Sequence, residues 1–133
     1  MSAIKIAKQY YEYFNKQDWQ GMLSLLDEDI RHEPNQGNTR IGKQQFAEFL
    51  KRMDECYQEK LTDLVFLSRK NSYLVAIEFV VHGVYKKAET GLPEAKNQPY
   101  ILPAAAFLEV HDHKITRIST HYNLPLWIKL VSM

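Results

Sequence analysis

The hydrophobic pattern of this chain changes its period once, after Tyr57, and that change limits the folds available to it. Before Tyr57, apolar residues recur at the three- and four-residue spacing of amphipathic helices. After Tyr57 they alternate with polar residues, as in strands that bury one face. Helices followed by a run of strands are typical of an α+β protein, with helices on one face of an antiparallel sheet. A parallel sheet built from alternating strands and helices is therefore not expected.

The first half of the chain predicts three helices. Ser2 can cap one that extends to about residue 16, Asp18 can cap a short second one, and a third follows Gly42. A short strand is predicted at residues 31–33, and it ends at Pro34 because proline donates no ladder hydrogen bond. The apolar faces of the helices contain Ile4, Ala7, Tyr11 and Phe14; Trp19, Met22, Leu23 and Leu26; and Phe46, Phe49, Leu50, Met53 and Tyr57.

The second half predicts four long strands, at residues 61–69, 72–86, 98–110 and 114–124, with a flexible hairpin loop at 87–97. The tail at 125–131 is apolar enough to pack against the rest. Together the pattern predicts a cone, in which three N-terminal helices close over the concave face of a strongly curved antiparallel sheet.

Length and composition fit one globular domain over residues 1–133, with 45% hydrophobic and 25% charged residues. The net charge of +1 leaves no basic excess for nucleic acid, and no apolar run is long enough to span a membrane. The start of the chain lacks a signal-peptide pattern, and the single cysteine, Cys56, cannot form an internal disulfide. We therefore expect a cytoplasmic protein without nucleic-acid or membrane partners.

His32-Glu33-Pro34 is the first candidate site, because it places a base and a carboxylate beside a polar loop. Neighbouring strand residues point to opposite faces, so only one of the two can face a cavity. We prefer Glu33 as the acid–base group, with His32 as the substitute if the strand phase is reversed. An exposed glutamate beside a hydrogen-bonded histidine is the alternative without function. The phenol of Tyr10 is a candidate hydrogen-bond donor, although tyrosines on such a helix are more often core residues.

Metal and cofactor chemistry have no motif in this sequence. His111-Asp112-His113 resembles a pair of metal ligands, but it lies at a predicted hairpin tip with no third ligand at zinc spacing. No glycine-rich phosphate loop or nucleophile elbow occurs. We expect neither a metal nor a cofactor.

Several motifs of this chain resemble those found in one protein superfamily. They are His32-Glu33-Pro34-Asn35-Gln36-Gly37, Gly91-Leu92-Pro93, Tyr100-Ile101-Leu102-Pro103-Ala104, and Tyr122-Asn123-Leu124 followed by Trp127. In their order along the chain they resemble the nuclear transport factor 2-like superfamily, which contains ketosteroid isomerases and SnoaL-like polyketide cyclases. Within it the chain is most similar to the bacterial ketosteroid isomerase-related proteins. The resemblance implies a cystatin-like cone with a hydrophobic pocket.

The resemblance also implies roles for individual residues. Glu33-Pro34 resembles the Asp-Pro pair that holds the isomerase base, although this alignment needs a one-residue gap. Without the gap, Pro34 takes the base position and His32 points inward. Tyr10 corresponds to the oxyanion tyrosine on the first helix. The second oxyanion acid has no counterpart, since its place falls at Ala105-Ala106, and ketosteroid isomerisation is therefore not expected.

From residues and resemblance together we expect a cofactor-independent acid–base enzyme of isomerase, cyclase, dehydratase or hydrolase type, acting on an apolar or cyclic molecule. A ligand-binding domain without turnover and a dimeric adaptor are the alternatives. A homodimer is predicted through the outer sheet face, which contains Glu78, His82, Phe107, Glu109, Arg117 and His121. The expected catalytic residues are Glu33, His32 and Tyr10, and the expected substrate-binding residues are Phe14, Asn35, Gln36, Phe79, Val81, Tyr100, Leu102, Tyr122 and Trp127.

Overall fold

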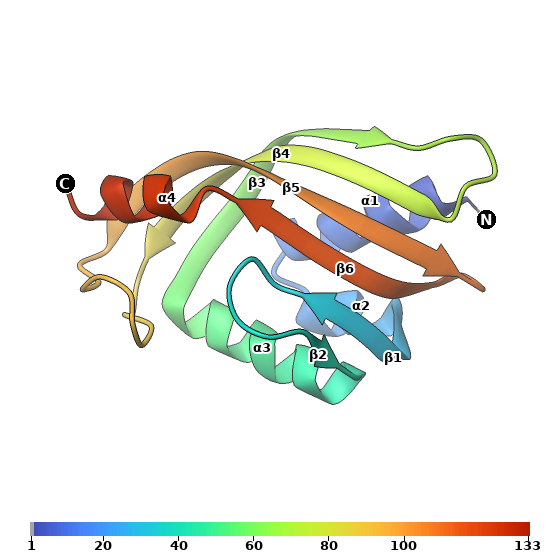
Figure 1. The fold of residues 1–133 in the computed structure, drawn as a ribbon, viewed down its shortest axis with the longest axis horizontal. Coiled ribbons are helices and arrows are strands. Elements are labelled where there is room, and N and C mark those ends of the chain that lie inside the picture. Colours follow the sequence, from blue (N-terminus) through green and yellow to red (C-terminus); the bar gives the residue numbers. More distant parts are fainter. Residues whose placement is uncertain (1) are drawn as a thin grey trace.

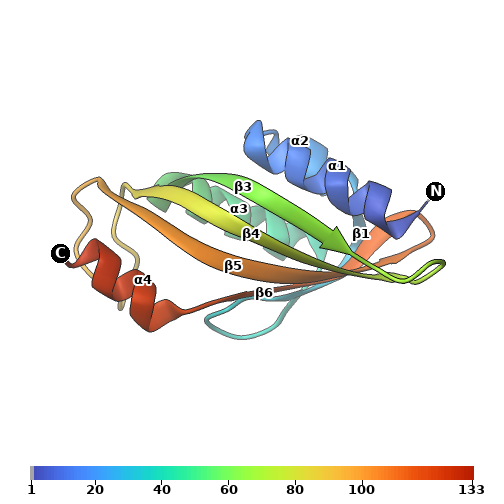
Figure 2. The ribbon, with the colours of Figure 1, turned by 90° about the horizontal axis from the view of Figure 1, so that it is seen from above.

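The structure, a computed structural model, describes residues 2–133 and is an α+β fold with one six-stranded sheet (Figure 1). Three helices, α1 (Ala3–Asn15), α2 (Trp19–Ser24) and α3 (Lys43–Cys56), lie on one face of the sheet (Figure 2). The strands are β1 (Leu26–Glu33), β2 (Arg40–Ile41), β3 (Tyr57–Leu67), β4 (Leu74–Tyr85), β5 (Gln98–His111) and β6 (Lys114–Tyr122). A fourth helix, α4 (Leu124–Val131), ends the chain. The predicted fold class is confirmed.

Polar side chains fix where the helices begin. The Ser2 hydroxyl accepts a hydrogen bond from the backbone N–H of Lys5, and the Asp18 carboxylate accepts one from Gly21 at 2.8 Å. Both are N-caps that satisfy otherwise unpaired backbone donors. The predicted tail is a helix because Asn123 caps α4 in the same way, by accepting from the N–H of Leu126.

The sheet order is β2-β1-β6-β5-β4-β3, and all pairs are antiparallel except β1 with β6, which are parallel. The alternating pattern predicts which side chains are buried but not the direction in which a strand runs, so it did not predict that β1 and β6 are parallel. The strands β1 and β3 also begin earlier than expected, at Leu26 and Tyr57.

The core lies between the helices and the concave face of the sheet. On β4 the buried side chains are Val75, Ile77, Phe79 and Val81, the face that the sequence predicts, while Glu78 and His82 are exposed on the other face. The register of β3 against β4 shifts between Thr62 and Val65, around Asp63, which has a φ of 54°. Such a bulge bends a strand and adds to the curvature of the sheet. Among residues 2–133, no helix is both long and apolar enough to cross a membrane.

Candidate functional site

A cavity of about 520 Å³ lies inside the cone, between the concave face of the sheet and the helices. Aromatic and aliphatic side chains form most of its wall, and a small number of polar groups face into it. This composition is typical of pockets that bind small molecules, in which apolar contacts provide affinity and a few polar groups set orientation.

All but two of the residues expected at the site line this cavity. Those that do are Tyr10, Phe14, His32, Asn35, Gln36, Phe79, Val81, Leu102, Tyr122 and Trp127. Asn35 also fixes the polar loop to the sheet, because its side-chain oxygen accepts a hydrogen bond from the backbone N–H of Tyr122 at 3.0 Å. The two exceptions are Glu33 and Tyr100.

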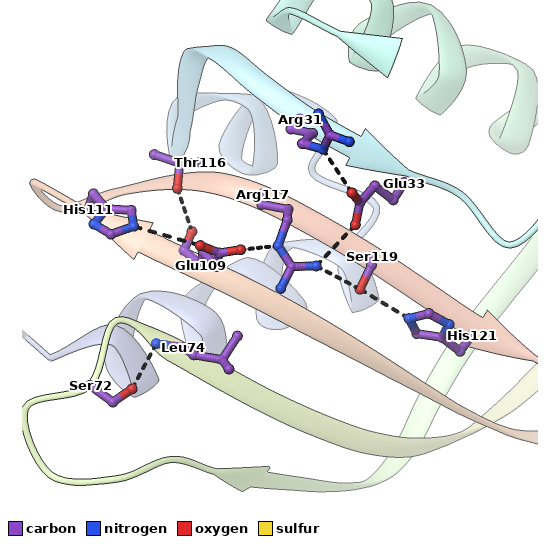
Figure 3. Close-up of polar contacts among 10 residues, drawn as sticks. All are labelled: Arg31, Glu33, Ser72, Leu74, Glu109, His111, Thr116, Arg117, Ser119 and His121. Carbon is purple, nitrogen blue, oxygen red and sulfur yellow. Dashed lines mark hydrogen bonds and ion pairs between the residues drawn. The ribbon is translucent and has the colours of Figure 1, made fainter. Parts of the chain in front are cut away.

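Glu33 lies on the outer face of the sheet, so the expectation that it faces the cavity is wrong. Its carboxylate accepts hydrogen bonds from Arg31 at 2.8 Å and from Arg117 at 3.1 Å (Figure 3). The hydrogen bond from Arg31 and the charge of Arg117 hold the pKa of Glu33 below its usual value. The strand has the reversed phase, in which His32 and Pro34 both line the cavity.

His32 is enclosed within the cavity wall. Only 3% of the residue is exposed, and its ring packs edge-on against Phe46 and Phe49, with centroid distances of 4.8 and 4.4 Å. Its Nδ1 atom is buried and has no hydrogen-bond partner among the described residues. Burial, together with the charge of Arg40, lowers the pKa of His32 to about 4. At neutral pH the ring is therefore uncharged.

Glu59, on β3, brings into the cavity a carboxyl group that the sequence analysis did not identify. The hydroxyl of Tyr100 donates a hydrogen bond to Glu59 Oε2 at 2.5 Å. Burial raises the pKa of Glu59 above its usual value, and the hydrogen bond from Tyr100 offsets part of that effect. A carboxyl group with a raised pKa in an apolar pocket is suited to exchange protons with a bound molecule.

Gly83 makes the contact between Tyr100 and Glu59 possible. The three residues lie in one row across β3, β4 and β5, since Glu59 pairs with Gly83 and Gly83 with Tyr100. A methyl group at Gly83 would lie well inside van der Waals distance of the Tyr100 ring. The ring therefore crosses the bare backbone of β4 and reaches the neighbouring strand. Tyr100 is thus buried behind the cavity wall, where it supports a lining residue instead of lining the cavity itself.

Residues of the β4–β5 loop form another part of the wall, where Glu89, Thr90, Gly91 and Leu92 line the cavity. Glu89 accepts a hydrogen bond from the hydroxyl of Tyr57 at 2.5 Å and pairs with Arg52 at 3.1 Å. The hydroxyl of Tyr85 donates a hydrogen bond to the carbonyl of Pro93 at 2.7 Å, which fixes the same loop to β4. Trp127 of α4 packs against the Tyr85 ring at 4.9 Å.

Tyr10 lies with Tyr11 on the buried face of α1, and both line the cavity. Their rings meet edge to face at 5.0 Å. Burial, and then the neighbouring phenol of Tyr11, raise the pKa of Tyr10 well above its usual value. Its hydroxyl therefore stays protonated and can act as a hydrogen-bond donor.

The histidines at the hairpin tip lie outside the cavity. His111 ends β5, and Asp112 and His113 form the exposed turn to β6. Within residues 2–133 there is no group of three or more histidine, cysteine, aspartate or glutamate side chains arranged to hold a metal ion.

The SnoaL-like domain family matches residues 7–118 of this chain. The chain belongs to the SnoaL-like family. Two similar solved structures carry the description of candidate polyketide cyclase. The protein from Xanthomonas campestris pv. campestris is 46% identical, with a TM-score of 0.93 over 97% of this chain and 96% of that one. The protein from Pseudomonas putida KT2440 is 42% identical, with a TM-score of 0.96 over 98% of both chains.

A more distant structure gives the fold alone. An NTF2-like protein of unknown function from Burkholderia pseudomallei K96243 is 15% identical to this SnoaL-like chain, with a TM-score of 0.81 over 100% of both chains. The nuclear transport factor 2-like fold expected from the sequence is therefore confirmed. A comparison with functionally curated proteins gives no match.

The alternation of side chains along β3 could have identified Glu59 from the sequence. On β3, Tyr57, Glu59 and Leu61 share one face, and Leu61 is buried in the core. The predicted strand began only at Leu61, so Glu59 fell in the gap between the helix and the strand. Extending the alternation back by two positions places a carboxylate on the concave face.

Proposed function

We propose that this SnoaL-like protein is a cofactor-independent acid–base enzyme of isomerase, cyclase, dehydratase or hydrolase type, acting on an apolar cyclic molecule held in the cavity. The observation that carries the proposal is the carboxyl group of Glu59, which faces an aromatic cavity and is hydrogen-bonded by Tyr100. Glu59 takes the acid–base role that the sequence assigned to Glu33. The description of two similar proteins as candidate polyketide cyclases supports chemistry of this class.

The surroundings of Glu59 suit proton transfer for a physical reason. An apolar wall penalises the carboxylate, which raises its affinity for a proton, while Tyr100 holds it in one orientation. A carboxyl group with a raised pKa can both take and return a proton during one turnover. The protonated phenol of Tyr10 supplies a donor for an oxygen on which negative charge develops.

The cavity also bears on the two alternatives. An adaptor that uses only its surface needs no internal space, so a cavity of about 520 Å³ favours a small-molecule function over an adaptor. A binding domain without turnover has the same cavity, and only a rate measurement separates it from an enzyme.

The test uses 2-tetralone, an apolar bicyclic ketone with acidic C–H groups next to its carbonyl. Exchange of these protons for deuterium in D₂O is followed by proton NMR, with and without the protein. We expect Glu59→Gln to reduce the accelerated exchange by roughly 10²–10⁴-fold, the usual contribution of a general base. Glu12→Gln, which changes an exposed glutamate on α1, is the matched control and should exchange at the wild-type rate. Binding of 2-tetralone without any acceleration would instead indicate a binding domain.

We also propose that the protein forms a homodimer through the outer face of the sheet. Phe107 on β5 exposes 38% of its surface there and is two residues from Glu109, which forms an ionic cluster with Arg117 and Glu33. Ile101, farther along the same strand, exposes 61%. Apolar centres bordered by charged groups are typical of interfaces between subunits. Light scattering at micromolar concentration tests this. A dimer that Phe107→Lys converts to monomers is the expected result, and a wild-type monomer would contradict it.

A further inference from the structure

We infer that His32 is a ligand-binding group of the cavity: its ring donates a hydrogen bond from Nε2 to an oxygen atom of an apolar ligand, such as a carbonyl oxygen. The inference deepens the proposed function and rests on it for the identity of the cavity as the ligand site. It is carried by a separate observation, the unpaired and enclosed Nδ1 atom of a histidine that lines the cavity.

The position of the ring leaves one nitrogen available to a ligand. His32 is buried between Phe46 and Phe49, which hold its ring edge-on from two sides. Nδ1 is fully enclosed, so a molecule in the cavity can reach this histidine only through Nε2. No hydrogen bond from another side chain within residues 2–133 occupies either nitrogen.

The enclosed Nδ1 also decides which nitrogen carries the proton. A neutral imidazole has one N–H and one lone pair. In folded proteins a buried N–H without an acceptor is rarer than a buried acceptor without a donor. The favoured tautomer therefore keeps the lone pair on Nδ1 and the proton on Nε2. His32 then presents an N–H to the cavity.

The surroundings keep this donor neutral. Arg40 on β2 is the Cα partner of His32, and its positive charge adds to the effect of burial in disfavouring a protonated ring. A neutral N–H donor in an aromatic wall suits an uncharged acceptor such as a carbonyl oxygen, because no counter-charge has to be desolvated. It can also hold the oxygen as charge builds on it, since a donor fixed in place does not reorganise during the reaction.

This placement gives the proposed reaction a second polar contact. When the bond between hydrogen and the carbon next to the carbonyl breaks, Glu59 takes the proton. The electron pair passes into the enolate, whose oxygen accepts the hydrogen bond from His32.

The first measurement is nitrogen-15 NMR of the wild-type protein labelled on histidine. The protonated and unprotonated ring nitrogens have well-separated shifts, so the spectrum shows directly which one carries hydrogen. We expect His32 to be the Nε2–H tautomer at neutral pH. A proton on Nδ1 would overturn the inference, and this measurement needs no variant that must fold.

The second measurement compares binding of 2-tetralone with that of tetralin, the same bicyclic skeleton without the carbonyl. We expect the wild type to prefer the ketone by about five- to tenfold, the contribution of one hydrogen bond. His32→Leu should abolish this preference without weakening tetralin binding, and His32→Gln, which retains an N–H donor, should keep part of it. His113→Asn, in the exposed turn outside the cavity, is the control and should keep all of it. An unchanged preference in His32→Leu would overturn the inference.

The two proposals fail separately. If the ketone preference depends on His32 but Glu59→Gln exchanges protons at the wild-type rate, the acid–base function is wrong and the carbonyl contact remains. If Glu59→Gln abolishes exchange while His32→Leu keeps the preference, the contact from His32 is wrong and the acid–base function remains.

Discussion

Two glutamates on strands of the same sheet have opposite surroundings. Glu59 faces the concave side, where burial raises its pKa and one tyrosine hydroxyl is its partner. Glu33 faces the convex side, where hydrogen bonds and charges from Arg31 and Arg117 lower its pKa. The sequence motif around Glu33 resembles a catalytic pair more closely, yet Glu59 has the environment that acid–base chemistry needs. The face of the strand, and not the motif, decides what each carboxylate can do.

The largest expected difference between the two is in activity. In the 2-tetralone exchange assay, Glu59→Gln should lose roughly 10²–10⁴-fold in rate, because it removes the proton acceptor. Glu33→Gln should stay within about twofold, because the side chain does not reach the cavity. The wild-type rate should also rise with pH, since Glu59 acts as a base in its charged form, with a midpoint above the ordinary glutamate pKa. Equal losses in the two variants would show that the faces do not separate the roles.

His32 and Glu33 extend the comparison to neighbours in the chain, and the second prediction concerns stability against pH. The pKa of folded His32 is about 4, whereas the unfolded chain binds this proton near the ordinary value of 6.5. The unfolded state therefore gains protons as the pH falls from 6.5 to 4, and stability decreases over that range. The loss should be on the order of 3 kcal/mol.

Urea denaturation of the wild type and of His32→Phe at pH 7 and pH 4 measures this loss. The variant should lose less stability than the wild type over the same interval, by the contribution of this one histidine. His113→Asn, which changes an exposed histidine in the turn between β5 and β6, should behave as the wild type does. If His32→Phe and the wild type lose the same amount, His32 is not held neutral by the fold.

Much of the fold was predictable because it depends on local patterns. The period change at Tyr57, the capping residues Ser2 and Asp18, and the alternation along β4 each act over a few residues. The parallel pairing of β1 with β6 was not predictable in this way, because the two strands are joined by most of the chain and no turn fixes their direction.

The site was harder to predict because it depends on which face of a strand each single residue points to. Most cavity residues followed from the apolar faces of the strands, but a shift of one residue decides whether His32 or Glu33 points inward. The contact of Tyr100 with Glu59 depends on the absence of a side chain at Gly83. The three residues lie on three different strands, so no local pattern shows that they meet. A glycine within a strand indicates that another group approaches the backbone closely, but it does not identify that group.

Gly83 gives the third prediction, which concerns how Glu59 is held. Gly83→Ala should destabilise the fold by roughly 1–3 kcal/mol, the usual cost of overpacking, because the Tyr100 ring must move. The displaced hydroxyl should no longer reach Glu59, so the midpoint of the pH–rate profile should move to higher pH. In a background of Tyr100→Leu the same substitution should cost much less, because the clash is gone, and denaturation of the four proteins gives this coupling directly. Additive costs would mean that the two residues do not meet.

The smallest expected effect belongs to the ion pairs of Glu33. The Glu33 side chain is 31% exposed, and part-exposed ion pairs contribute little because water screens them. Glu33→Gln should therefore destabilise the fold at pH 7 by about 0.5–1 kcal/mol. Since the folded pKa of Glu33 is lowered, this stabilisation is present above the ordinary glutamate pKa and is lost as the pH falls through the folded value. Wild type and variant should thus differ at pH 7, converge as the pH falls below the ordinary glutamate pKa, and differ less in high salt than in low salt. A larger effect that salt leaves unchanged would mean that these ion pairs lie within the proposed interface and not at its border, and that Glu33 is then as shielded from water as Glu59.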